Sequence, residues 1–123
     1  MMPAGKYYVG DLCHVMDEEW EEFCKLTING NGSIDGEFSL NSGVRFASFE
    51  TKNGTGQYKD NFGKLYTVEA SIIGCILVDD IIDHNADLSQ GTIQDFKESF
   101  CPYIDNGVIT FNQVCINAEP EDN

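Results

Sequence analysis

The segment that most constrains the fold is residues 54–80, which read GTGQYKDNFGKLYTVEASIIGCILVDD. Two β-forming stretches flank an Asn-Phe-Gly loop at 61–63, whose glycine is free to take a positive φ, so this part predicts a β-hairpin. The stretch that follows, residues 72–82, is the most apolar of the chain. Such a near-continuous apolar run predicts a strand that is buried on both faces at the centre of a sheet.

The rest of the chain alternates strand patterns with Asn, Gly and Ser turns, which is typical of an antiparallel meander. We expect a first strand that bends at Gly10, because glycine inside a strand pattern marks a bulge or a close backbone approach. The further strand patterns outside the central segment lie at residues 33–40, 44–51 and 108–116, and the first covers residues 6–16.

Two short amphipathic helices are expected. The first covers residues 17–26, with Asp17 as its N-cap and its acidic side chains on the solvent face. The second covers residues 92–100, where Thr92 and Asp95 resemble a capping box and Pro102 follows the end.

Length and composition fit one domain. With 123 residues and 41% hydrophobic content, the chain can bury a sizeable core without a disulfide or metal. We therefore predict a single α+β domain over residues 1–123, with a frayed tail at 118–123. Its architecture is mainly an antiparallel curved sheet or small open barrel of about six to seven strands, with two short packed helices.

The charge balance limits the class of partner. Acidic residues number 21 against 7 basic ones, for a formal net charge of −14. Such a surface repels phosphates, which excludes direct binding of nucleic acid. Three interpretations remain: solubility alone, an acidic face that docks onto a basic partner, and cation binding. The acids are dispersed along the chain, which favours solubility.

The sequence also indicates a compartment. The N-terminal residues lack the apolar segment of a signal peptide, and no apolar run reaches the length of a membrane span. Five widely spaced cysteines without a CxxC pair argue against a disulfide framework and against a zinc ribbon. We therefore expect a cytoplasmic protein in a reducing environment, with no membrane contact and no cofactor.

Four stretches resemble a family of small proteins from bacteria, phages and large viruses. They are GKYYVGDLCHVM at 5–16, DEEWEEFC at 17–24, DGEF at 35–38 and GQYKDNFGKLYTVEASIIGCILV at 56–78. The family shows a YVGDLCYV-type start, a Trp in the following helix and a GxYxDxxGxxYxVDSGxIG-type block. The resemblance implies no established activity. This chain departs from the block by having Glu69-Ala70-Ser71 in place of Asp-Ser-Gly.

Three carboxylates are the candidate catalytic residues: Asp11, Asp60 and Glu69. Each lies in or beside a β-rich motif, and two that converge could share a proton or a cation. The structural interpretation is that Asp11 accepts backbone N–H bonds, Asp60 caps the hairpin turn and Glu69 faces solvent. Catalysis by a cysteine paired with His14 or His84 lacks a supporting motif. Cys13 and His14, as strand neighbours, are expected on opposite faces.

A second candidate site is the calcium-like spacing Asp83-x-Asn85-x-Asp87. The pattern lacks the turn glycine and the final bidentate Glu of a calcium loop, which favours a loop whose acids simply solvate it.

The third candidate is an interface of exposed aromatic residues, Tyr8, Tyr58 and Phe62, with core packing as the alternative. The leading functional hypothesis is a small, acidic, non-enzymatic interaction or regulatory module that binds a protein partner or itself. The alternative is an enzyme or a small-ligand or cation binder that uses Asp11, Asp60 and Glu69 in a sheet-lined cleft.

Overall fold

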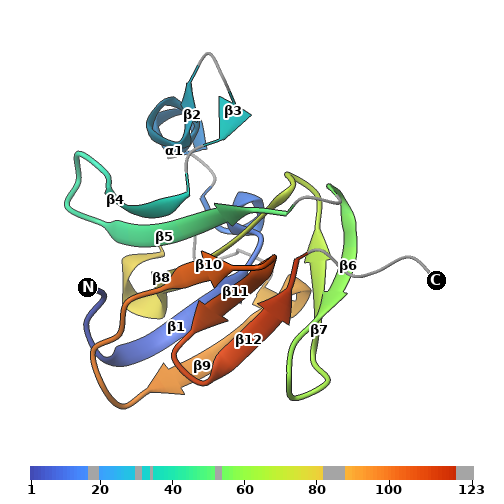
Figure 1. Cartoon of the computed structure of the whole chain (residues 1–123). Helices are drawn as coiled ribbons and strands as arrows, with labels where there is room; N and C mark the ends of the chain where they lie inside the picture. The colour runs from blue at the N-terminus through green and yellow to red at the C-terminus, as the bar shows by residue number, and fades with distance from the viewer. Residues whose placement is uncertain (17–19, 30–31, 34, 52–53, 82–87, 119–123) are drawn as a thin grey trace.

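The computed structural model describes residues 1–16, 20–29, 32–33, 35–51, 54–81 and 88–118. Over these residues the fold is mostly antiparallel β-sheet with one α-helix, and none of the described helices is long and apolar enough to cross a membrane. The elements in chain order are β1 (Gly5–Gly10), η1 (Leu12–His14), α1 (Trp20–Thr27), β2 (Ile28–Asn29), β3 (Gly32–Ser33), β4 (Gly36–Ser39), β5 (Arg45–Glu50), β6 (Gly56–Lys59), β7 (Leu65–Val68), β8 (Ile72–Leu77), η3 (Val78–Asp80), η4 (Leu88–Gln90), β9 (Thr92–Phe96), β10 (Tyr103–Asp105), β11 (Val108–Phe111) and β12 (Val114–Asn117) (Figure 1).

The largest sheet has five strands in the order β4-β5-β8-β1-β9. Its central strand is β8, which confirms the predicted central position of the apolar run at 72–82. The strand itself ends at Leu77, where η3 begins. Side chains alternate between its two faces: Ile73 and Cys75 join one core, and Ile72 and Ile76 join the other. Both faces of this sheet are therefore buried.

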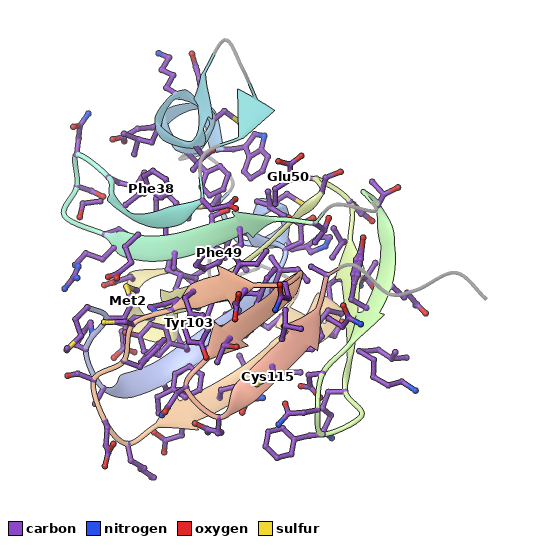
Figure 2. All side chains as sticks on the ribbon, viewed as in Figure 1. Met2, Phe38, Phe49, Glu50, Tyr103 and Cys115 are labelled. Carbon is purple, nitrogen blue, oxygen red and sulfur yellow. The ribbon has the colours of Figure 1, made fainter. Side chains whose placement is uncertain are left out.

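One core lies between the five-stranded sheet and the three-stranded sheet β10-β11-β12, which lies in front of it in Figure 1. Phe49 of β5 meets Phe111 of β11 edge to face, with ring centroids 6.0 Å apart. The second core lies under α1, where Phe23 packs on Phe46 at 4.9 Å. Phe38, labelled with Phe49 in Figure 2, stacks on the same Phe46 ring at 5.5 Å.

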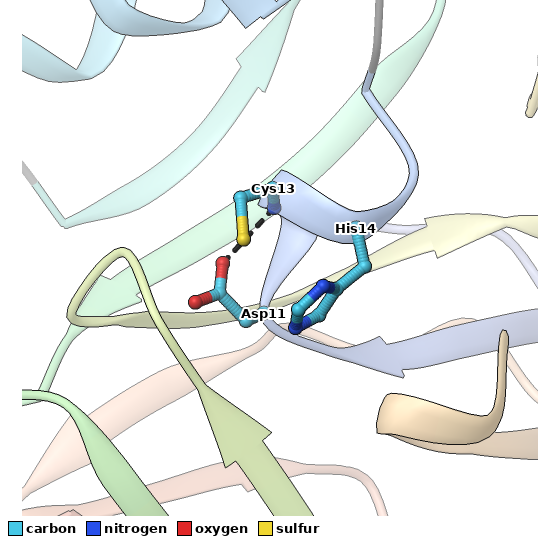
Figure 3. A group of neighbouring side chains, drawn as sticks. All are labelled: Asp11, Cys13 and His14. Atoms are coloured by element: carbon cyan, nitrogen blue, oxygen red, sulfur yellow. Dashed lines mark hydrogen bonds between the residues drawn. The ribbon is translucent and has the colours of Figure 1, made fainter. Parts of the chain in front are cut away.

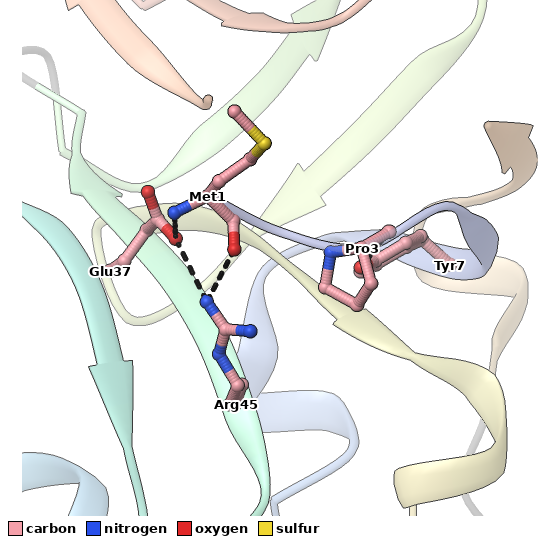
Figure 4. Close-up of polar contacts among 5 residues, drawn as sticks. All are labelled: Met1, Pro3, Tyr7, Glu37 and Arg45. Carbon is pink, nitrogen blue, oxygen red and sulfur yellow. Dashed lines mark hydrogen bonds and ion pairs between the residues drawn. The ribbon is translucent and has the colours of Figure 1, made fainter. Parts of the chain in front are cut away.

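The N-terminal residues are tied to the β4–β5 edge of the sheet and to β1. The Met1 amino group lies 2.9 Å from Glu37, and Arg45 bonds both Glu37 and the Met1 carbonyl (Figure 4). The Tyr7 hydroxyl donates to the Pro3 carbonyl at 2.6 Å. Burial raises the pKa of Tyr7, so this hydroxyl stays protonated and keeps donating at high pH.

The hairpin β6–β7 is present where the sequence predicts it. It is joined to the three-stranded sheet by a bridge between Asp60 and Ile116. The Asn61 N–H donates to the Cys115 carbonyl, and the Cys115 N–H donates to Asn61 Oδ1. The hairpin thus continues the edge of β12.

Residues 92–100 are not a helix, contrary to the sequence prediction. Residues Thr92–Phe96 form β9, which pairs antiparallel with β1 from Thr92 to Phe96. The i, i+3, i+7 spacing of Ile93, Phe96 and Phe100 fits a helix, but pairing with β1 satisfies the backbone of both strands. Ile93, expected in a buried stripe, is 43% exposed. The prediction of two packed helices is therefore wrong for the second one.

Three other boundaries differ from the prediction. The first strand ends at Gly10 and gives way to η1, because Asp11 caps a tight turn. Residues 108–116 are two strands, β11 and β12, since the turn at Asn112 reverses the chain with a φ of 55°. Ala118 is buried and bonded to Gly107, so it is not part of a frayed tail; residues 119–123 lie outside the described residues. The strands are consequently more numerous and shorter than expected, and they form separate sheets and not one curved sheet.

Candidate functional site

Asp11 stands at a junction of three elements. It directly follows β1, precedes η1, and is completely buried. Its Oδ1 accepts the Cys13 N–H at 2.9 Å, and its Oδ2 accepts the N–H groups of Glu69 and Ala70 at 2.7 and 2.6 Å. An aspartate that bonds the N–H two residues on favours a tight turn. Asp11 therefore both starts η1 and fastens the β7–β8 connection to it.

The η1 turn brings Cys13 and His14 to the same side as Asp11. One ligand atom from each of the three side chains lies within 4.8 Å of the other two (Figure 3). The expectation that Cys13 and His14 face opposite sides is wrong, because it assumed an extended strand and the backbone here is a 3-10 turn. Both side chains are half-buried.

The surroundings of Cys13 favour its neutral thiol. Burial, followed by the charge of Asp11 and a hydrogen bond with it, raises the Cys13 pKa to about 12; the Glu69 carboxylate adds to the effect. The thiolate is the reactive form of cysteine, so at neutral pH this sulfur is a poor nucleophile. His14 Nε2 lies 3.2 Å from the Thr67 carbonyl, so it faces a backbone acceptor. A Cys–His nucleophile pair is not supported by this arrangement.

Asp60 is buried where β6 enters the turn of the β6–β7 hairpin. Its Oδ1 accepts the N–H groups of Phe62 and Lys64 at 2.8 and 2.9 Å, and its Oδ2 accepts the Tyr66 hydroxyl at 2.6 Å. The hydroxyls of Tyr66 and Thr92 lie 2.9 Å apart. Burial and the hydrogen bond to Asp60 raise the Tyr66 pKa. Asp60 therefore acts as the turn cap that the structural interpretation predicts.

The three candidate carboxylates do not converge. Asp60 is bonded at the start of β7, whereas Asp11 is bonded to the residues after its end. The length of β7 separates these points by roughly 15 Å along the backbone. Glu69 is exposed. The structure brings Asp11 close to Glu69 but not to Asp60, so no shared carboxylate pair forms between the two buried aspartates.

The proposed aromatic interface is wrong for two of its three residues. Tyr8 and Tyr58 are buried, because each points into one of the two cores. Phe62 is 58% exposed at the turn of the hairpin, and Leu65, the first residue of β7, is 53% exposed. We use "hairpin surface" for the exposed group formed by Phe62 and Leu65 together with Lys59, the cross-strand partner of Leu65, and Lys64.

The calcium-like residues Asp83, Asn85 and Asp87 lie outside the described residues, as does His84. Two features of the described residues were not predicted from the sequence. Asp11, Cys13 and His14 share one side, and the signal for it is the Asp-x-Cys spacing of a side-chain-capped turn. Leu65 is exposed, which follows from its alternation with the buried Tyr66.

Comparison of the chain with protein-family models, with curated proteins and with solved structures found no match.

Proposed function

We propose that this protein is a small, non-enzymatic interaction module that binds a protein partner through its hairpin surface. The observation that carries the proposal is Phe62, a large aromatic side chain that is 58% exposed at the end of a firmly held turn. Exposed aromatic residues in fixed positions are the usual anchors of protein interfaces.

The turn that presents Phe62 is fixed by hydrogen bonds on both sides. Asp60 accepts the N–H groups of Phe62 and Lys64, and Asn61 exchanges bonds with Cys115 and donates to the Gln113 carbonyl at 3.0 Å. A rigid turn loses little conformational freedom on binding, so more of the contact energy appears as affinity. The buried carboxylate of Asp60 thus fixes the backbone position of Phe62.

Charge indicates the chemistry of the partner's contact site. Lys59 lies across from Leu65 and Lys64 directly precedes it, and neither lysine takes part in an ion pair among the described residues. The fitting contact is an apolar pocket with an acidic rim. At physiological salt the screening length is about 8 Å, so these lysines act locally although the chain has a net charge of −14.

The experiment places a photo-crosslinking p-benzoylphenylalanine at position 62 in the cells that produce the chain. Position 103 is the matched control, because Tyr103 is an aromatic side chain of similar exposure, 53%, on β10 (Figure 2). We expect a discrete adduct from position 62 only. Its mass distinguishes a second copy of this chain from a different protein.

The captured protein is then purified, and its affinity for the intact chain is measured by calorimetry. Phe62→Ala should weaken binding by about tenfold or more, as expected for a central anchor. Tyr103→Ala should leave it unchanged. Equal effects of the two variants would refute the hairpin surface as the binding site.

Two further assignments accompany this proposal. The motifs at 5–16 and 56–78 support membership in the family of small bacterial, phage and viral proteins that they resemble.

All five cysteines are free of disulfides, which supports a reducing, cytoplasmic location. The alternative function, an enzyme or a small-ligand or cation binder that uses Asp11, Asp60 and Glu69, is weakened because Asp60 lies away from the other two.

A further inference from the structure

We propose that Asp11, Cys13 and His14 bind one divalent transition-metal ion, and that their donor set selects zinc. The site lies at the η1 turn and is separate from the hairpin surface, so the two proposals stand or fall independently.

The donor geometry is close to that of a metal site. One carboxylate oxygen, one sulfur and one imidazole nitrogen lie within 4.8 Å of one another. Tetrahedral zinc with bonds of about 2.0–2.3 Å requires ligand atoms about 3.3–3.6 Å apart. The side chains must therefore approach by roughly 1 Å, which side-chain rotation on one short turn can supply. Calcium and magnesium prefer oxygen donors only, so sulfur and nitrogen disfavour them.

Asp11 retains one place for the metal. An ionised carboxylate offers about four lone-pair positions. Two on Oδ2 are taken by the N–H groups of Glu69 and Ala70, and one on Oδ1 by the N–H of Cys13. One position is left, and the Cys13 thiol lies next to this carboxylate (Figure 3). The backbone bonds hold the Asp11 side chain in place, as outer-shell partners do for a metal-bound carboxylate.

His14 brings one imidazole nitrogen within range of the other two donors. Its Nε2 lies 3.2 Å from the Thr67 carbonyl, and an oxygen acceptor there favours the tautomer with a proton on Nε2. Nδ1 then carries the free lone pair. A ligating histidine ordinarily donates its other N–H to a carbonyl or carboxylate.

The charges balance when the metal binds. Cys13 gives up its thiol proton to solvent and its sulfur forms a bond to the metal, so one proton is released per ion. The aspartate, the thiolate and the divalent cation then sum to zero net charge, which suits a partly buried position. The half-burial of Cys13 and His14 leaves part of each side chain open to solvent.

The test is titration of the full chain with Co²⁺, which reports its ligands by absorbance, followed by competition with Zn²⁺. We expect one ion per chain, a thiolate-to-cobalt charge-transfer band, visible bands of tetrahedral intensity and release of one proton. Cys13→Ser and His14→Gln should each weaken binding by about tenfold or more. Asp11→Asn is unsuited, because Asp11 also holds the backbone.

The matched control uses another cysteine. Cys24→Ser, which changes a second half-buried cysteine, should bind Co²⁺ as the unchanged chain does. Absence of the charge-transfer band, or equal binding by Cys13→Ser and the unchanged chain, would overturn the proposal. Thermal unfolding of each variant without metal verifies that it is folded.

Discussion

Asp11 and Asp60 are both buried, and both use their oxygens to hold backbone N–H groups. Asp11 fastens the β7–β8 connection to η1, and Asp60 fastens the hairpin turn. Charge-assisted bonds of this kind are stronger than neutral ones. Buried carboxylates in a β-rich motif are therefore explained here by local geometry, although the same residue types occur in catalytic pairs.

Asp11→Asn should destabilise the fold by about 1.5–3 kcal/mol, because an amide nitrogen replaces one accepting oxygen and leaves at least one N–H without a partner. Urea denaturation measures the change. Glu69→Gln is the matched control: its carboxylate is exposed, so its effect should stay within about 0.5 kcal/mol. Equal effects would mean that the bonds to Asp11 carry little stability.

Cys13 should make stability fall at alkaline pH. Its pKa is raised from 9.0 to about 12 in the folded state, so the folded chain keeps a proton that the unfolded chain loses. This contribution is complete below pH 9.0 and is lost as pH rises toward about 12. Urea denaturation at pH values between 9.0 and about 12 measures this. The free energy of unfolding should fall less steeply with pH for Cys13→Ser than for the unchanged chain. Parallel declines would contradict the assignment.

The elements differ in how far the sequence determines them. The central strand β8 and the β6–β7 hairpin were predictable, because an unbroken apolar run and an Asn-Phe-Gly loop each favour one local structure. The strand β9 was not, because its apolar spacing also fits a helix and only the open edge of β1 selects the strand. The grouping of Asp11, Cys13 and His14 was not predictable either. Cys13 and His14 lie on one side only because the chain leaves the strand at Asp11.

Gly74 tests the packing of the central strands. A Cβ added there would lie 2.1 Å from the Ala47 carbonyl oxygen and 2.9 Å from Leu12. Backbone atoms on β5 cannot yield as a flexible side chain would, so Gly74→Ala should cost about 3 kcal/mol or prevent folding. Gln57→Ala, an exposed change on β6, should be within about 0.5 kcal/mol. A Gly74→Ala variant whose free energy of unfolding equals that of the unchanged chain would contradict the register of β5 and β8.

At the scale of the whole molecule, the five-stranded sheet has one core on each face, and the chain as a whole is strongly acidic. The chain has a net charge of −14, and among the described residues the ion pairs involve three acids, Glu21, Glu37 and Asp95. Self-repulsion of the remaining charge opposes the compact state. The stability of this fold should therefore depend on salt.

Raising NaCl from about 10 mM to about 200 mM shortens the screening length from about 30 Å to under about 10 Å. The melting temperature should rise by about 3–5 °C, which corresponds to roughly 1 kcal/mol. Calorimetry with an uncharged solute of equal osmolality provides the control. A melting temperature that is independent of salt would show that the acids do not repel one another appreciably.

The central claim is that Asp60 holds the hairpin turn while Phe62, two residues on, makes the functional contact. The decisive measurement is the paired determination of unfolding free energy and partner affinity for Phe62→Ala. Because Phe62 is 58% exposed, we predict a stability change within about 0.5 kcal/mol and a loss of affinity of about tenfold or more for the protein captured at position 62. Unchanged affinity in a fully folded variant would contradict the claim.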